Sequence, residues 1–305
     1  MIPYFDAHCD TALPVWAAGK SLAENSFHLD LRRISACAPS AQVFAVCVDY
    51  SDDMTGATDA VVANLLREIE ANAARVRLCR GAADISAVAA EGKTAALISI
   101  EGAERLDCSV DKLRALYTLG VRIVHLTWND DNILCGAALG SGAGLTEQGR
   151  EFLCAAQRMG VAIDLSHCSE RGFWDALESA EKPMLAGHSN ARALCDHSRN
   201  LTDAQFRALA ASGGVAGLNF CTDVLGGGRD VEAIVDHAAH WLSLGGEKAV
   251  CLGTDFDGIP ELPGGIEGVQ SMDVLYNAML RRNWSEDTVR DIFWHNLNNF
   301  FAKVI

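Results

Sequence analysis

The chain has 305 residues, half of them hydrophobic, and a formal net charge of −15. Such an acidic protein is a poor partner for nucleic acid or for an anionic membrane surface, because phosphate contacts require clustered Lys and Arg. No apolar run approaches the ~18 residues of a membrane span, and the N-terminus has no basic segment or apolar core typical of a signal peptide. We therefore expect a cytoplasmic protein with neither a membrane nor a nucleic-acid partner.

The eleven cysteines are scattered, and no two of them have Cys-x-x-Cys spacing. An odd count without that spacing is typical of reduced thiols that are buried as small apolar side chains. The cysteines therefore predict neither a disulfide scaffold nor a thiolate zinc site.

Eight runs of strand length, rich in apolar or β-branched residues, follow one another along the chain. They are Ile2–Asp6, Gln42–Val48, Ala95–Ile100, Val121–Leu126, Val161–Leu165, Pro183–Ala186, Gly214–Leu218 and Ala249–Leu252. Helical patterns lie between most of them. Four of these patterns begin at capping residues, namely Ser109, Thr146, Thr202 and Ser285.

Continuously apolar strands that alternate with helices indicate a parallel sheet covered on both faces. Eight such units in one chain predict an α/β fold, the (β/α)8 TIM-type barrel, as a single domain over residues 1–305. A doubly wound open sheet has the same alternation and is the alternative.

In a (β/α)8 barrel the catalytic groups lie at the C-terminal ends of the strands. Histidines or acids stand at five of the eight predicted strand ends: His8 with Asp10, Glu101, Asp164 with His167, His188, and Asp255. His8 and Asp10 are two positions apart, so they point to the same side of the strand. A single such residue is usually a satisfied polar group or a helix N-cap. A whole set at strand ends instead predicts one shared site.

Mixed histidine and carboxylate ligands suit Zn, Mn or Fe(II) better than Ca or Mg. The set is larger than one zinc with an open position requires. Two metal ions that share a bridging carboxylate are therefore the predicted arrangement.

These residues resemble those of a known family, the membrane (renal) dipeptidases, which are metallopeptidases of the amidohydrolase-type barrels. The matching motifs run in family order over nearly the whole chain. They are Asp6-Ala7-His8-Cys9-Asp10, Glu101-Gly102, Asp164-Leu165-Ser166-His167, Gly187-His188-Ser189, Ser198-Arg199-Asn200 and Gly253-Thr254-Asp255-Phe256-Asp257-Gly258.

The resemblance implies a zinc-dependent dipeptidase that hydrolyses short peptides with a hydroxide bridging two Zn²⁺ ions. His8 and Asp10 would hold one ion, His167 and His188 the other, and Glu101 would bridge them. Arg199 would bind the carboxylate of a dipeptide substrate, and Asp255 would act as general acid and base. The identity of the native metal is left open, and so is the oligomeric state, for which a homodimer is one option.

Two departures from the family pattern fall around the expected substrate site. Trp128 stands where mammalian members carry a histidine, and Cys221 stands where a tyrosine is expected. An indole N–H donates one hydrogen bond but cannot become cationic. His125 lies three positions before Trp128, on the opposite face of the strand by alternation, so a simple exchange of roles is not expected.

Three alternatives remain open from the sequence. The same metal site could act on another small amide or a lactam, or the metal-loaded barrel could serve as a binding or scaffold protein. A serine hydrolase is the third, because Gly187-His188-Ser189-Asn190-Ala191 is close to Gly-x-Ser-x-Gly, with Asp255 and His295 following in triad order. That third reading leaves His8, Asp10, Glu101 and His167 without a role.

Overall fold

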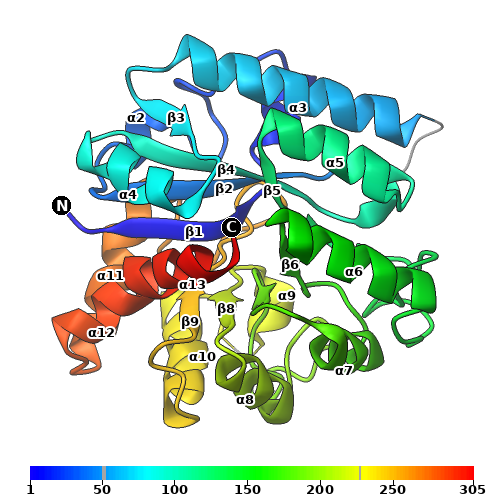
Figure 1. Cartoon of the computed structure of the whole chain (residues 1–305). Helices are drawn as coiled ribbons and strands as arrows, with labels where there is room; N and C mark the ends of the chain where they lie inside the picture. Colours follow the sequence, from blue (N-terminus) through cyan, green and yellow to red (C-terminus); the bar gives the residue numbers. More distant parts are fainter. Residues whose placement is uncertain (50–52, 227) are drawn as a thin grey trace.

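The computed structural model describes residues 1–49, 53–226 and 228–305, and within these residues eight parallel strands close into a barrel (Figure 1). The barrel strands are β1 (Tyr4–Cys9), β2 (Ser40–Val46), β4 (Thr94–Ile100), β5 (Val121–His125), β6 (Ala162–Asp164), β7 (Leu185–Ala186), β8 (Val215–Leu218) and β9 (Val250–Leu252). Each strand pairs with the next around the ring, and the pairing of β2 with β4 closes it. The predicted (β/α)8 barrel is therefore confirmed, and the open sheet is wrong.

A further strand, β3 (Val76–Leu78), extends the sheet beside β4. It pairs with the first residues of β4, with Val76 opposite Thr94, whereas β5 pairs with the last residues of β4. The sequence pattern does not predict this strand, because it is three residues long and only Val76 is buried.

Helices surround the barrel, and the four capping residues predicted from the sequence each accept a backbone N–H from the third residue of the helix they precede. The helices are α1 (Ala12–Ala17), α2 (Leu31–Ile34), α3 (Met54–Ala71), α4 (Ala82–Ala90), α5 (Val110–Leu119), α6 (Glu147–Met159), α7 (Glu170–Ser179), α8 (Asp203–Ala211), α9 (Thr222–Leu225), α10 (Val231–Ser243), α11 (Met272–Arg281), α12 (Glu286–Arg290) and α13 (Asn296–Val304). Within the described part of the chain, none combines the length and apolar character needed to cross a bilayer.

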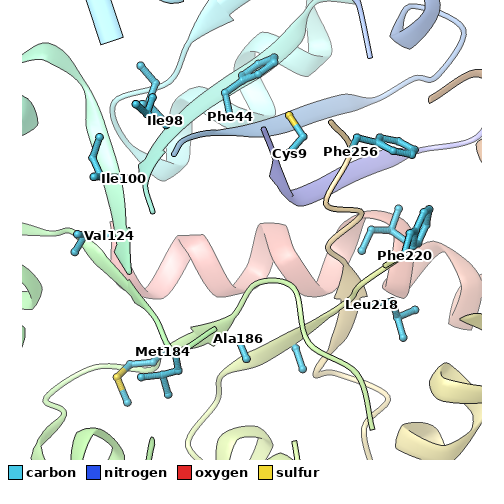
Figure 2. Close-up of a cluster of buried hydrophobic side chains, with 14 of the residues drawn as sticks. Cys9, Phe44, Ile98, Ile100, Val124, Met184, Ala186, Leu218, Phe220 and Phe256 are labelled. Atoms are coloured by element: carbon cyan, nitrogen blue, oxygen red, sulfur yellow. The ribbon is translucent and has the colours of Figure 1, made fainter. Parts of the chain in front are cut away.

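Two apolar layers pack against the barrel, one between the strands and the surrounding helices and one at the end that is closed. Side chains that point outward from the strands, such as Phe44 on β2 and Ile98 on β4, belong to the layer between barrel and helices (Figure 2). Side chains that point inward, such as Phe5, pack with the C-terminal helix α13, which lies across one end of the barrel (Figure 1). The Phe5 and Phe301 rings are stacked, with centroids 5.6 Å apart. The plugged end is the N-terminal end of the strands, so a site can open only at their C-terminal ends.

Candidate active site

The C-terminal ends of five strands bring the predicted residues together. The contributing residues are His8 in β1 with Asp10 just after it, Glu101 after β4, His167 after β6, His188 after β7 and Asp255 after β9. Five of them are buried, and Asp255 is partly exposed toward a cavity. The barrel closure accounts for this arrangement, because it carries parallel strand ends to one rim.

Glu101 lies at the centre of the cluster. Its Oε1 is 2.9 Å from His167 Nε2 and 3.4 Å from His188 Nε2. Its Oε2 is 3.5 Å from His8 Nε2 on the other side. The two oxygens of one carboxylate therefore face two different sets of imidazoles, as a bridging ligand requires.

The first strand end behaves as the alternation rule predicts. His8 Nε2 lies 3.3 Å from Asp10 Oδ2, so both side chains point into the cluster. Asp255 Oδ1 lies 3.9 Å from the same nitrogen of His8. Ligand atoms of His8, Asp10 and Glu101 all lie within 4.8 Å of one another, as do those of His8, His188 and Asp255.

The charges of these groups depend on burial and on their neighbours. Burial, helped by the charge of Glu101, raises the pKa of Asp10 to about 8. Burial alone would raise the pKa of Glu101, but the positive charge of His8 and hydrogen bonds from His167 and His188 hold it well below its usual value. Burial and the charge of Arg199 lower the pKa of His167 to about 3. Glu101 is thus a carboxylate and His167 a neutral imidazole, which are the forms that bind metal, whereas Asp10 would have to release a proton to become a ligand.

Two site residues adopt left-handed backbone conformations. His167 has φ +72°, and Asp255 has φ +60°. Non-glycine residues seldom occupy this region, and the contacts around them hold them there. The backbone N–H of Asp255 donates to the carbonyl of His8 at 3.1 Å, and Asn219 Nδ2 donates to Asp255 Oδ2 at 3.0 Å. Asp255 Oδ1 is left facing the cluster.

Asp6 fastens the first strand to the segment that carries Asp255. Its Oδ1 accepts the backbone N–H of Thr254 at 2.8 Å, and its Oδ2 accepts the Thr254 hydroxyl at 2.7 Å and Gln42 Nε2 at 2.9 Å. The sequence motifs contain Asp6 and Thr254, but the two residues are far apart in the sequence, so the motifs alone do not predict their contact. This carboxylate sets the spacing between the β1 and β9 ends of the site.

Arg199 reaches the cluster from the loop that follows β7. Its Nε donates to His167 Nδ1 at 3.1 Å, and Nη2 lies 2.9 Å from His188 Nε2. A metal ion on His188 Nε2 needs the lone pair that the second contact uses, so metal binding would turn the guanidinium toward the cavity. Asn129 Oδ1 also lies 3.1 Å from His167 Nδ1. Once the guanidinium has turned away, this oxygen can accept the N–H of the other His167 tautomer, which would leave Nε2 free as a ligand.

A cavity of about 480 Å³ opens beside the cluster. Both residues that depart from the family pattern, Trp128 and Cys221, line its wall together with Leu139. The guanidinium of the fully buried Arg105 lies 4.9 Å from the centre of the Trp128 ring, in a cation–π contact. Trp128 is therefore held in place as a rigid apolar wall. The cavity suits a small ligand.

His125 is a residue of this region to which the sequence pattern assigned no role. It ends β5 and is fully buried, and its ring centroid lies 5.4 Å from that of His8 and 5.6 Å from that of His188. Its ring and the Trp128 ring both lie 6.4 Å from His167. Strand alternation stops at His125, so it does not by itself set the direction of Trp128; Trp128 lines the cavity, whereas His125 does not.

The serine hydrolase alternative does not match the geometry. Ser189 is buried, and its backbone N–H donates to the carbonyl of Gly217. His295 is exposed on the helical segment beyond α12 and is not part of the cavity wall that includes Asp255. These three residues therefore do not form a triad.

Comparison with known proteins matches this geometry to a family. The sequence model described as "Membrane dipeptidase (Peptidase family M19)" matches residues 1–304. The chain belongs to this family. The dipeptidase is 37% identical over 246 residues to an uncharacterized Klebsiella pneumoniae protein from the pqqA 5′ region, covering 76% of this chain and 90% of that protein. It is also 34% identical over 229 residues to an uncharacterized dipeptidase of Schizosaccharomyces pombe, covering 72% of this chain and 55% of the relative.

A solved structure of a metallo peptidase has the same fold. A metallo peptidase from Rhodobacter sphaeroides, liganded with a phosphinate mimic of the dipeptide L-Ala-D-Ala, superposes with a TM-score of 0.91 at 28% identity. The match covers 100% of this dipeptidase and 99% of that chain. The predicted resemblance is confirmed, and the chain is a metallo-dipeptidase, a hydrolase that acts on peptide bonds.

The donor set of the dipeptidase fits the metal cofactor that the family implies. Among the described residues, Asp10 Oδ1 is buried without a hydrogen-bond partner, and the Nε2 atoms of His8 and His188 face the Glu101 carboxylate. The raised pKa of Asp10 records repulsion from Glu101 as well as burial, and a bound cation would relieve both. Nitrogen and oxygen donors in this mixture are those that zinc and similar ions prefer.

Proposed function

We propose that this dipeptidase is a zinc enzyme that hydrolyses the peptide bond of dipeptides at two metal ions. His8 and Asp10 would hold one ion, His167 and His188 would hold the other, and Glu101 would bridge them. The observation that carries the proposal is the position of the Glu101 carboxylate, whose two oxygens face His167 and His188 on one side and His8 on the other.

Ions in these positions would lower the pKa of bound water to about 7 and polarise the peptide carbonyl. Asp255 would then move the protons. Its Oδ2 is occupied by Asn219, whereas Oδ1 faces the cluster 3.9 Å from His8 Nε2. Burial raises the pKa of Asp255, which brings it closer to the neutral range where a proton carrier works best. Oδ1 would take a proton from the attacking water and give it to the departing amine.

Arg199 would select substrates with a free carboxylate close to the scissile bond. A guanidinium grips a carboxylate through two parallel hydrogen bonds, which a point charge cannot reproduce. Arg199 lines the cavity beside the metal ligands, so a carboxylate bound there would lie about one residue from the reacting carbonyl. This spacing and the small cavity favour a dipeptide over a longer chain. The mimic of L-Ala-D-Ala bound by the Rhodobacter sphaeroides relative extends the proposal to L-D dipeptides.

A second candidate is hydrolysis of another small amide or a lactam by the same ions. Trp128 and Cys221 favour it, because both side chains line the cavity and change the groups that a substrate would meet. The metals and Asp255 would have the same roles in either case, so only the substrate differs.

The test is a turnover screen of zinc-reconstituted protein on a panel of L-L and L-D dipeptides, N-acyl amino acids and lactams. We expect hydrolysis of dipeptides that a chelator abolishes and a serine-directed fluorophosphonate does not affect. Hydrolysis confined to lactams or N-acyl amino acids would select the second candidate. No turnover on any of these compounds, with two ions bound, would instead support a binding or scaffold role.

A further inference from the structure

His125 and Asp164 form a buried pair directly beneath the candidate metal centre. They stand opposite each other in the register of β5 and β6, and both are fully buried. His125 Nε2 lies 3.4 Å from Asp164 Oδ2. The other oxygen of Asp164, Oδ1, accepts the backbone N–H groups of Ser166 at 2.8 Å and Gly187 at 2.9 Å. The carboxylate is therefore fixed by the backbone, and its second oxygen is directed at the imidazole.

The polar atoms of this pair are not satisfied by the protein. In the part of the chain that the structure describes, neither ring nitrogen of His125 has a hydrogen-bond partner, and Asp164 Oδ2 has none either. Buried polar groups are nearly always paired, so three unpaired atoms at one place indicate a missing partner. The five ligands expected from the sequence include neither residue of this pair.

The imidazole lies within reach of the metal ligands. Ligand atoms of Glu101, His125 and His188 all lie within 4.8 Å of one another, which is a spacing that one ion can bridge. A histidine that binds a metal usually donates its other ring N–H to a carboxylate, which fixes the tautomer and orients the ring. The His125–Asp164 pair provides both parts of that arrangement.

We propose that His125 is a sixth protein ligand of the metal centre, binding the ion that Glu101 and His188 hold, with Asp164 as the carboxylate that orients it. The inference rests on the proposed metal centre and adds to it a residue of this chain. His125 is in a strand, whereas His167 is in the loop after β6 with φ +72°. The same ion would thus have one ligand on a rigid element and one on a loop.

The first experiment compares cobalt binding by the wild type and by His125→Gln. Glutamine keeps a polar side chain opposite Asp164 but is a poor metal ligand. In His125→Gln we expect one of the two Co²⁺ ions to bind at least tenfold more weakly, as measured by competition with a chelator. The visible absorption of that ion should also change. The other ion should be unaffected. Asp164→Asn should weaken the binding of the same ion by a smaller factor.

The matched control is His237→Gln. His237 is also fully buried, but its ring accepts the Ala191 N–H and contacts the Leu225 carbonyl, away from the cluster. This control should keep both affinities and the absorption spectrum. Wild-type affinities and spectrum in His125→Gln would overturn the inference.

A second measurement does not depend on any variant folding. In crystals of the wild type grown with Zn²⁺, a ring nitrogen of His125 should lie about 2.0–2.1 Å from an ion. Two ions bound with a water molecule between His125 and the nearer one would overturn this inference and leave the proposed function standing. No bound zinc at all would overturn both.

Discussion

Asp255 is the residue whose replacement best separates proton transfer from metal binding. Asp255→Asn keeps the size of the side chain, and asparagine tolerates the left-handed backbone at this position, where φ is +60°. The new amide oxygen can still accept the hydrogen bond that Asn219 Nδ2 donates to Asp255 Oδ2 at 3.0 Å. The fold should therefore be unchanged. What the variant loses is the ability of the second oxygen to accept and release a proton.

General acid–base catalysis contributes roughly 10²- to 10⁴-fold, which corresponds to about 3–5 kcal/mol of activation free energy. We expect kcat for a dipeptide to fall by that factor in Asp255→Asn, with KM changing little and the zinc content the same as in the wild type. Asp223→Asn is the matched control, because Asp223 is an exposed aspartate on the same cavity wall. It should retain wild-type turnover.

Two results would refute this account of Asp255. Turnover within about threefold of the wild type would remove it from proton transfer, since a general base contributes far more than that. Loss of a metal ion would show that Asp255 is a ligand, a role that its proximity to His8 and His188 allows. Zinc analysis and steady-state kinetics on one protein sample distinguish these outcomes.

Three further predictions follow from the geometry. Asp6→Ala leaves the Thr254 N–H and hydroxyl and Gln42 Nε2 without their acceptor, so we expect a loss of about 3–5 kcal/mol in the free energy of unfolding. At roughly 2.1 cal/mol/K of unfolding entropy per residue, the melting temperature should fall by about 5–8 °C, and a change below 1 °C would contradict this. Arg199→Lys should raise KM for dipeptides at least tenfold with kcat less affected, because the bidentate grip is lost; an equal KM would be contrary to the proposed role. Zinc binding at pH 7 should release protons, since burial and Glu101 raise the pKa of Asp10 to about 8; calorimetric heats that do not depend on the buffer would contradict it.

The residues at the strand ends could be predicted from the sequence because two local rules were sufficient. Apolar runs mark the strands of a parallel barrel, and the barrel places the residues that follow those runs on one rim. His8, Glu101 and His188 were found in this way without any knowledge of distances. Element boundaries shifted by up to three residues, as at β1, which extends to Cys9 and includes His8.

Contacts between distant segments could not be predicted by those rules. The bonds from Asp6 to Thr254 depend on the register of β1 against β9, which pattern alone does not give. His125 was set aside because strand alternation placed it opposite Trp128. Alternation holds only within a strand, and β5 ends at His125, so the chain beyond it is free to bring Trp128 to the same region.

The central claim is that the Glu101 carboxylate joins two metal ions. Its most direct test is anomalous X-ray diffraction at the zinc absorption edge from crystals of the wild-type protein grown with Zn²⁺. We predict two peaks, one on each side of Glu101, the first within bonding distance of His8 and Asp10 and the second within bonding distance of His167 and His188. A single peak, or two peaks that do not share Glu101, would contradict the account.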